Sequence, residues 1–283
     1  MAGVNKEKRP EERTKQFKKV NDNKTKVVVD ENSAIIKIFR GFQGELDAKH
    51  DKHERLVKIS RDVTIDSKRT IFLLHRHRDG SDREGNDEIL NDAKDKIKEI
   101  QNIRFLAMAE ELEGEDPYQF MRAISPGMQE YIEAISFYYY LKHGQLISLK
   151  EIQKDLVFSK TGEDGQNQTL TLNVPPIEYL LGLADLTGEL MRLAINSVGA
   201  GNLETPYKIC EFLQIVYDAF NSYGNTLKDL NRKMGTLRQS LRKVENACYT
   251  LHVRGSEIPK HMLADVFMAS GDDKYAEDVD SQF

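Results

Sequence analysis

Four carboxylates, arranged as two closely spaced pairs, are the residues of this sequence best suited to chemistry. Asp185 and Glu189 are four residues apart in the sequence, and Glu130 and Glu133 are three residues apart, so each pair spans about one helical turn. On a helix, side chains at these spacings are neighbours, with Cβ atoms about 5 to 6 Å apart. Carboxylates this close repel one another unless a proton or a cation lies between them. Each pair is therefore a candidate site for a proton or a metal cation.

The segment from 177 to 197 is apolar around most of a helix, so its few polar positions are informative. They fall at alternating intervals of four and three residues, which places them on one narrow stripe: Glu178, Gly182, Asp185, Glu189, Arg192 and Asn196. Arg192 follows Glu189 by one turn and could clamp a phosphate. The alternative is that the stripe is the solvent-exposed face of an amphipathic helix, and spacing alone favours that alternative.

The segment from 117 to 142 has a similar face, which contains Gln119, Arg122, Pro126, Glu130 and Glu133. The Pro126-Gly127 step can kink or restart this helix just before its carboxylate pair. If the two helices face each other, their four carboxylates form an oxygen-rich site that suits Mg²⁺ or Mn²⁺. Such an ion supports phosphodiester hydrolysis by binding a phosphate oxygen and lowering the pKa of a water. Spacing alone does not show that the two helices meet.

The charge of the chain bears on nucleic-acid binding. The formal net charge is −5, which argues against a protein that holds RNA by its overall electrostatics. A partner is therefore expected to supply much of the affinity for RNA. Basic residues between 49 and 78, Lys68 among them, could line an RNA path, but acidic residues alternate with them as on an ordinary exposed helix face. Lys68, Arg122 and Arg192 are the candidates for RNA contacts.

Between polar ends, apolar residues recur at intervals of three and four with almost no strand alternation, so the sequence predicts an all-α fold. At 283 residues the chain can bury one substantial core. About seven helices in an antiparallel bundle are expected over residues 31–268. Helix start and stop signals place them at 33–78 (one long helix or two in succession), 87–113, 117–142, 149–156, 176–199, 205–224 and 227–254, with a loop at 161–167.

The two ends of the chain contrast in charge. Residues 1–30 are polar and basic and are expected to be a disordered tail, which is either simply solvated or a bipartite nuclear import signal. Residues 269–283 form an acidic tail that is expected to be flexible. No apolar run approaches the roughly 20 residues of a membrane-spanning helix. With two cysteines and no signal peptide, the expected location is cytoplasmic and nuclear.

Several long segments resemble the translin family. They are Gly44–Lys58, Ser67–Arg76, Tyr179–Arg192, Asn196–Gly199 and Lys243–Tyr249. The ending Val253–Phe267 is similar to one branch of that family, distinct from translin itself. The resemblance covers roughly residues 35 to 268.

This resemblance implies a translin-like all-α fold and assembly with translin into a hollow hetero-oligomer. It also implies a magnesium-dependent endoribonuclease that cuts single-stranded RNA, including passenger-strand fragments in RNA silencing, with its active site in this subunit. The matching segments carry the metal-binding and catalytic roles to Glu130, Glu133, Asp185 and Glu189, the residues that spacing also selects. Ser125-Pro126-Gly127 departs from the family pattern and leaves the helix start open. The rival hypothesis is a non-catalytic partner that stabilises translin and adapts it to RNA or protein ligands.

Overall fold

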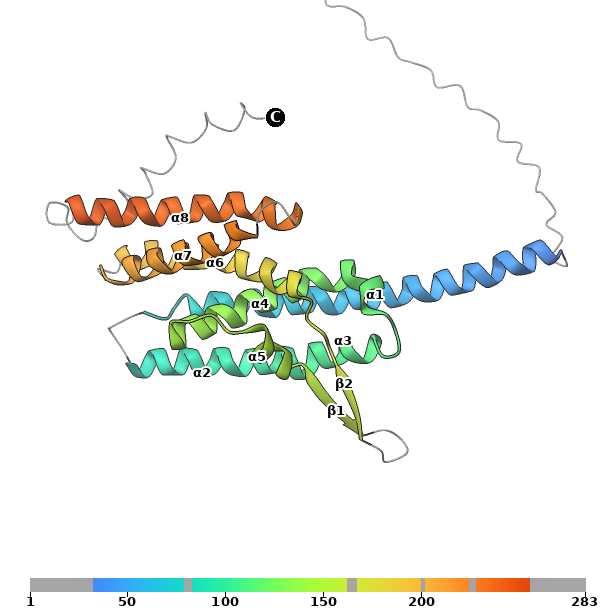
Figure 1. Ribbon diagram of the computed structural model, residues 1–283. Helices are drawn as coiled ribbons and strands as arrows, with labels where there is room; N and C mark the ends of the chain where they lie inside the picture. Colours follow the sequence, from blue (N-terminus) through green and yellow to red (C-terminus); the bar gives the residue numbers. More distant parts are fainter. Residues whose placement is uncertain (1–32, 79–82, 162–166, 200–201, 224–227, 255–283) are drawn as a thin grey trace, which may run out of the picture. The chain divides into compact units, whose positions relative to one another are not determined.

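The computed structural model describes residues 33–78, 83–161, 167–199, 202–223 and 228–254 (Figure 1). The chain divides into two compact units, Met1–Asp47 and Ala48–Phe283. Helix α1 (Ala34–Leu74) is one continuous helix that begins in the first unit, which decides between the two alternatives expected for 33–78. The predicted tails, 1–30 and 269–283, lie outside the described residues.

The remaining helices all belong to the second unit and confirm the all-α prediction. They are α2 (Arg83–Glu99), α3 (Leu106–Glu111), α4 (Met121–His143), α5 (Leu149–Lys154), α6 (Pro176–Gly199), α7 (Thr205–Ser222) and α8 (Lys228–Arg254). Their starts follow local capping chemistry. The Asp116 carboxylate accepts a hydrogen bond from the Tyr118 N–H at 3.0 Å, and Pro117 opens a short 3₁₀ turn, η2 (Pro117–Phe120), that leads into α4.

The predicted helix 87–113 begins earlier than expected and is interrupted. Helix α2 starts at Arg83, and a π-helical segment, η1 (Ile100–Phe105), separates it from α3. Within η1 the Gln101 side chain is buried and donates a hydrogen bond to the Tyr131 hydroxyl at 2.7 Å. Buried positions on both sides of η1 keep intervals of three and four residues, so periodicity gives no sign of the interruption.

The structure agrees with the prediction of almost no strand and adds one small hairpin that the sequence did not predict. Strands β1 (Val157–Thr161) and β2 (Asn167–Thr171) pair antiparallel. Of the loop expected at 161–167, the two end residues belong to these strands, and 162–166 lie outside the described residues. Phe158 lies opposite Leu170 in this pairing, and both are buried against the core. Because only these two large side chains face the core, the apolar alternation is too short to identify from sequence.

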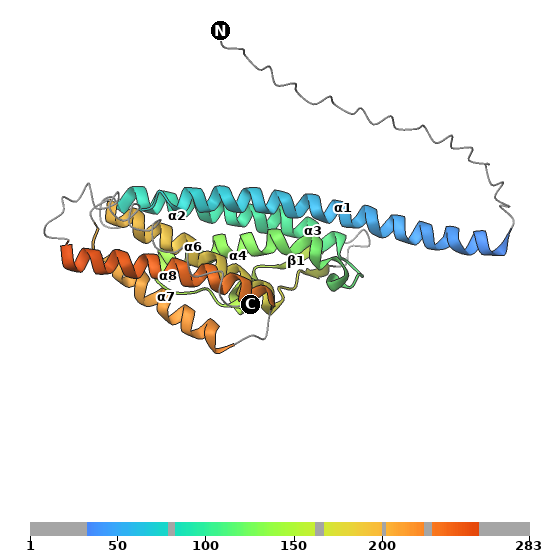
Figure 2. The same ribbon diagram turned by 90° about the horizontal axis from the view of Figure 1, so that it is seen from above.

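Helix α6 lies at the centre of the second unit. It contacts α4 on one side and both α7 and α8 on the other, as the two views in Figures 1 and 2 show. Helix α4 contributes to two buried clusters, with Met128 and Ile132 in one and Ala134 and Phe137 in the other. None of the described helices is both long enough and apolar enough to cross a lipid bilayer.

Two glycines allow α4 to approach its neighbours closely. A Cβ atom added to Gly182 of α6 would lie 2.7 Å from both Cβ and Cγ2 of Ile132 of α4. A Cβ atom added to Gly127 would lie 2.6 Å from the backbone oxygen of Ser60 in α1, whose hydroxyl accepts the Gly127 N–H at 3.0 Å. Helix α4 continues through Pro126 and does not restart there. The Pro126-Gly127 step thus supplies a contact with α1.

Replacing Gly182 by alanine should push α6 away from α4. We expect Gly182→Ala to lower the free energy of unfolding by about 1 to 3 kcal/mol, the usual cost of overpacking a core. Gly188→Ala on the same helix is the matched control, because no atom lies within 4 Å of an added Cβ there. It should stabilise the protein by up to about 1 kcal/mol through helix propensity. Chemical denaturation measures both, and equal effects would contradict the close approach.

Candidate active site

The packing of α4 against α6 brings the two carboxylate pairs together. Glu130 and Glu133 face Asp185 and Glu189 across the helix contact, and the charges of the other three act on Glu133. We call these four residues the carboxylate centre. The stripe on α6 is therefore not a solvent-exposed face along its whole length. It is turned toward α4 at Glu178 and Gly182, which are buried, and reaches solvent at Arg192.

Glu133 is the innermost member of the carboxylate centre, with only 8% of its surface exposed. Burial, followed by the negative charges of Glu130, Asp185 and Glu189, raises the pKa of the Glu133 carboxyl to about 8. At neutral pH without a metal ion, this side chain therefore holds a proton most of the time. A buried carboxyl that keeps its proton because of neighbouring carboxylates marks a place where positive charge is favoured.

The other three carboxylates each contact a basic group from a different part of the chain. Lys68 Nζ of α1 lies 3.1 Å from Glu130 Oε1, and Lys233 Nζ of α8 lies 2.5 Å from Asp185 Oδ2. His75, just after α1, lies with Nε2 2.5 Å from Glu189 Oε2. Protein side chains thus already offset part of the negative charge in the carboxylate centre.

Glu189 is held in place more firmly than an exposed carboxylate. The His75 ring lies 4.9 Å from the Phe137 ring, and its Nδ1 is buried with no hydrogen-bond partner among the described residues. Nε2 is therefore the nitrogen that carries a proton in the neutral ring and donates it to Glu189. Partial burial raises the pKa of Glu189, but the His75 hydrogen bond and the charge of Arg192 outweigh it, so the pKa lies below its ordinary value.

The predicted RNA-contacting residues are placed unequally. Lys68 and Arg192 are both mostly exposed and pair with members of the carboxylate centre, Arg192 through Nη1 at 3.4 Å from Glu189. Arg122 is exposed on α4, but it precedes Glu130 by eight residues, about 12 Å along the helix axis. The structure therefore brings Lys68 and Arg192 to the centre and leaves Arg122 apart from it.

Spacing and resemblance do not select two residues of the site, His75 and Lys233. His75 gives no local signal, because its partner Glu189 lies 114 residues away along the chain. Lys233 was not singled out, although a signal was present. It lies on the stripe of α8 that carries the buried residues Leu230 and Leu237, where a lysine is unusual unless its charge is paired.

The donor set has the chemistry of a site for a hard divalent cation, since it consists of four carboxylates with one deeply buried. The ammonium of Lys233 already lies against Asp185, which shows that a cation is accommodated there. Among the described residues, however, no three His, Cys, Asp or Glu side chains stand together as a ready set of metal ligands. Three of the four carboxylates pair instead with Lys68, His75 and Lys233.

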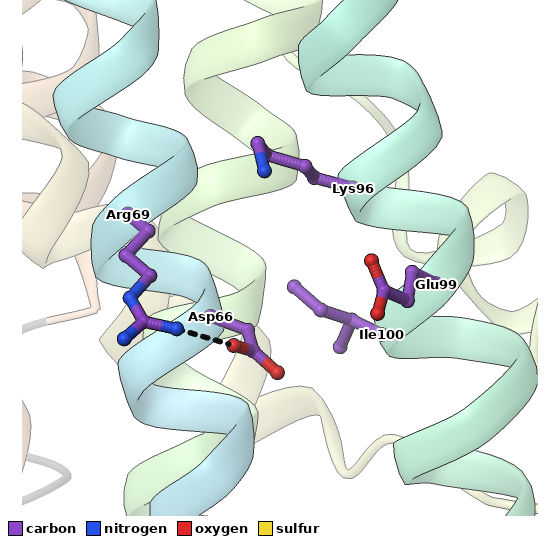
Figure 3. A pocket seen from close by; sticks show the side chains of 5 residues that line it. All are labelled: Asp66, Arg69, Lys96, Glu99 and Ile100. Atoms are coloured by element: carbon purple, nitrogen blue, oxygen red, sulfur yellow. Dashed lines mark ion pairs between the residues drawn. The ribbon is translucent and has the colours of Figure 1, made fainter.

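A separate polar pocket of about 240 Å³ lies between α1, α2 and the start of η1 (Figure 3). It is lined by Asp66, Arg69, Lys96, Glu99 and Ile100, and Arg69 pairs with Asp66 at 3.6 Å. Its two acidic and two basic side chains balance one another. It contains none of the four carboxylates and none of Lys68, Arg122 and Arg192, so the carboxylate centre is the better candidate.

The model of the translin family matches residues 51–255 of this chain, which includes the whole carboxylate centre. The chain belongs to the translin family. It is 52% identical to the mouse (Mus musculus) protein named translin-associated protein X over 254 residues, which are 85% of this chain and 86% of that protein. A Schizosaccharomyces pombe homolog of that protein is 27% identical, covering 77% of this chain and 89% of its own length.

The fold also resembles a solved structure described as "Structure of AfC3PO - duplex RNA complex". The TM-score is 0.54 at 19% sequence identity, and the likeness covers 81% of this chain and 96% of that one. At this identity the likeness concerns the fold alone. It confirms that the translin-like arrangement of helices expected from the sequence is the one present.

Glu133 should make the stability of the metal-free protein depend on pH. Below about pH 4.5 the carboxyl is protonated in both folded and unfolded chains. Between there and about pH 8 only the folded chain keeps the proton, so its contribution to stability falls as the pH rises through this window. Glu133→Gln mimics the protonated form. We therefore expect its melting temperature, relative to wild type, to rise by about 3 °C or more between pH 5 and pH 8.5 in EDTA.

Differential scanning fluorimetry of both proteins across that pH range measures the difference. Glu211→Gln, at an exposed position of α7, is the control and should follow wild type at every pH. A Glu133→Gln curve parallel to wild type would mean that Glu133 titrates as an ordinary exposed carboxyl.

Proposed function

We propose that this chain is the catalytic subunit of a magnesium-dependent endoribonuclease that works as a hetero-oligomer with translin and hydrolyses single-stranded RNA. The observation that carries the proposal is the convergence of two carboxylate pairs from α4 and α6 around the buried Glu133. Carboxylates collected at one place cost stability, and such an arrangement is typical of functional sites.

Glu130, Glu133, Asp185 and Glu189 would hold Mg²⁺, or Mn²⁺ in its place. The bound ion would supply Lewis-acid stabilisation of the phosphate and a water of lowered pKa. Glu133 would give up its proton, because the cation would offset both the cost of burying its charge and the repulsion of the neighbouring carboxylates, which together raise its pKa. His75 would keep Glu189 in one orientation through its Nε2 hydrogen bond, as partners of metal-binding carboxylates do.

Lys68 and Arg192 lie at the exposed edge of the carboxylate centre and would contact the RNA backbone. Both have more than half of their side-chain surface exposed, so they can turn from Glu130 and Glu189 toward a phosphate. Arg192 suits this role because its guanidinium can donate two parallel hydrogen bonds to one phosphate. Arg122 would contact RNA only farther along the strand.

The hetero-oligomer with translin rests on the similarity to proteins named as translin-associated. The net charge of −5 supports it, because an acidic chain needs a partner to attract RNA. We extend the proposal to removal of passenger-strand fragments in RNA silencing, and to a protein of cytoplasm and nucleus.

A second candidate function is a non-catalytic partner that stabilises translin and adapts it to RNA or protein ligands. The pairing of Glu130, Asp185 and Glu189 with protein cations favours it, since a structural polar cluster would be neutralised in the same way. Cleavage measurements separate the two functions.

Glu189→Ala should abolish RNA cleavage without disturbing assembly. The chain is co-expressed with translin and a labelled single-stranded RNA is incubated with Mg²⁺ or EDTA. We expect cleavage that requires Mg²⁺ and falls at least about a hundredfold in the variant, the usual loss when a catalytic group is removed. Glu211→Gln is the control and should cut at the wild-type rate. Cleavage that persists in Glu189→Ala would move the active site elsewhere and leave this chain as a structural partner.

Arg192→Gln should weaken RNA binding more than it slows cleavage at saturating RNA. Loss of one phosphate contact reduces the slope of log affinity against log salt concentration by about one. Fluorescence anisotropy with a labelled RNA over a salt series measures this slope. An unchanged slope would show that Arg192 serves only its ion pair with Glu189.

A further inference from the structure

Lys233 enters the carboxylate centre from α8, a helix that carries none of the four carboxylates. Its side chain is 20% exposed, and its Nζ lies 2.5 Å from Asp185 Oδ2. The same ammonium donates to Gln129 Oε1 at 2.9 Å and to the Leu181 carbonyl oxygen at 3.2 Å. Three acceptors from α4 and α6 therefore hold one positive charge beside the centre.

The two neutral acceptors belong to a firm framework. Gln129 donates through Nε2 to Glu178 Oε2 at 2.7 Å and to Ser125 Oγ at 2.9 Å, and Ser125 also donates to Glu178 at 2.7 Å. Because Glu178 is buried, this network fixes the orientation of the Gln129 amide and hence the place of its oxygen. The Lys233 ammonium therefore has two neutral acceptors besides Asp185, namely that oxygen and the Leu181 carbonyl.

We propose that Lys233 is a positioning residue that acts as the resident cation of the carboxylate centre, holding Asp185 while no divalent ion is bound and competing with that ion for Asp185. This inference rests on the proposed function, since it concerns how the same centre takes up its metal. It accounts for the lack of a ready set of metal ligands among the described residues.

The other basic partners are less suited to this role. Lys68 is 63% exposed and its ammonium pairs with Glu130 at the surface, so solvent competes for it. His75 contacts Glu189 through a ring nitrogen and can do so without any charge. Lys233 is the basic residue whose charge lies at the centre. Its charge lowers the pKa of Glu133, whereas the neighbouring carboxylates raise it.

Removing the charge of Lys233 should therefore tighten divalent-ion binding. Even with the screening of water, a unit charge about 5 Å from a divalent ion changes its affinity by about threefold or more. We would purify the full chain with translin and titrate it with Mn²⁺ in the absence of RNA, following free Mn²⁺ by electron paramagnetic resonance. Lys233→Met and Lys233→Gln should each bind Mn²⁺ at least about threefold more tightly than wild type, and Lys233→Arg, which keeps the charge, should stay near wild type.

Lys243→Met is the matched control, because Lys243 is an exposed lysine of the same helix, and its affinity for Mn²⁺ should not change. Unchanged or weaker binding in both Lys233→Met and Lys233→Gln, with folding verified by thermal denaturation, would overturn the inference. Failure of the proposed function has a different result: wild type and Glu189→Gln would then bind Mn²⁺ equally weakly.

Discussion

The close approach of α4 and α6 at Gly182 is the contact on which the candidate site depends. With hydrogen in place of a side chain at this position, Ile132 lies where a Cβ atom would otherwise be. The helix axes can then come near enough for carboxylates on both helices to act on one another. Gly127 plays a similar part between α4 and α1, from which Lys68 and His75 reach the carboxylate centre. The carboxylate centre therefore depends on close backbone contacts at two glycines.

Electrostatic repulsion among the carboxylates opposes this close packing of α4 and α6. Four carboxylates in one place repel one another, and the folded chain tolerates them because Glu133 keeps a proton while α1, α8 and the residue after α1 supply positive or hydrogen-bonding groups. Burial of the hydrophobic clusters on both sides of α4 stabilises the fold and offsets the free-energy cost of this repulsion. Such a centre favours added positive charge, as the Lys233 ammonium beside Asp185 indicates.

The fold was largely predictable because most of its elements are long and strongly periodic. The starts of α4, α6 and α7 follow proline and capping signals, so their positions agree with the structure to within a few residues. The hairpin β1–β2 was not predictable, since Phe158 and Leu170 alone carry its burial. The π-helical segment η1 was not predictable, because the buried positions on either side of it keep intervals of three and four residues.

The sequence by itself determined which residues are the candidates for chemistry. Spacing placed Glu130 beside Glu133 and Asp185 beside Glu189, because helical periodicity fixes where each side chain lies around its own axis. Only the tertiary structure decided that these two faces meet, that Glu133 is the buried member, and that His75 and Lys233 complete the centre. Periodicity carries no information about which helix packs against which. Lys233 follows every carboxylate of the centre by more than forty residues in the sequence. Only the packing of α8 on α6 makes it their neighbour.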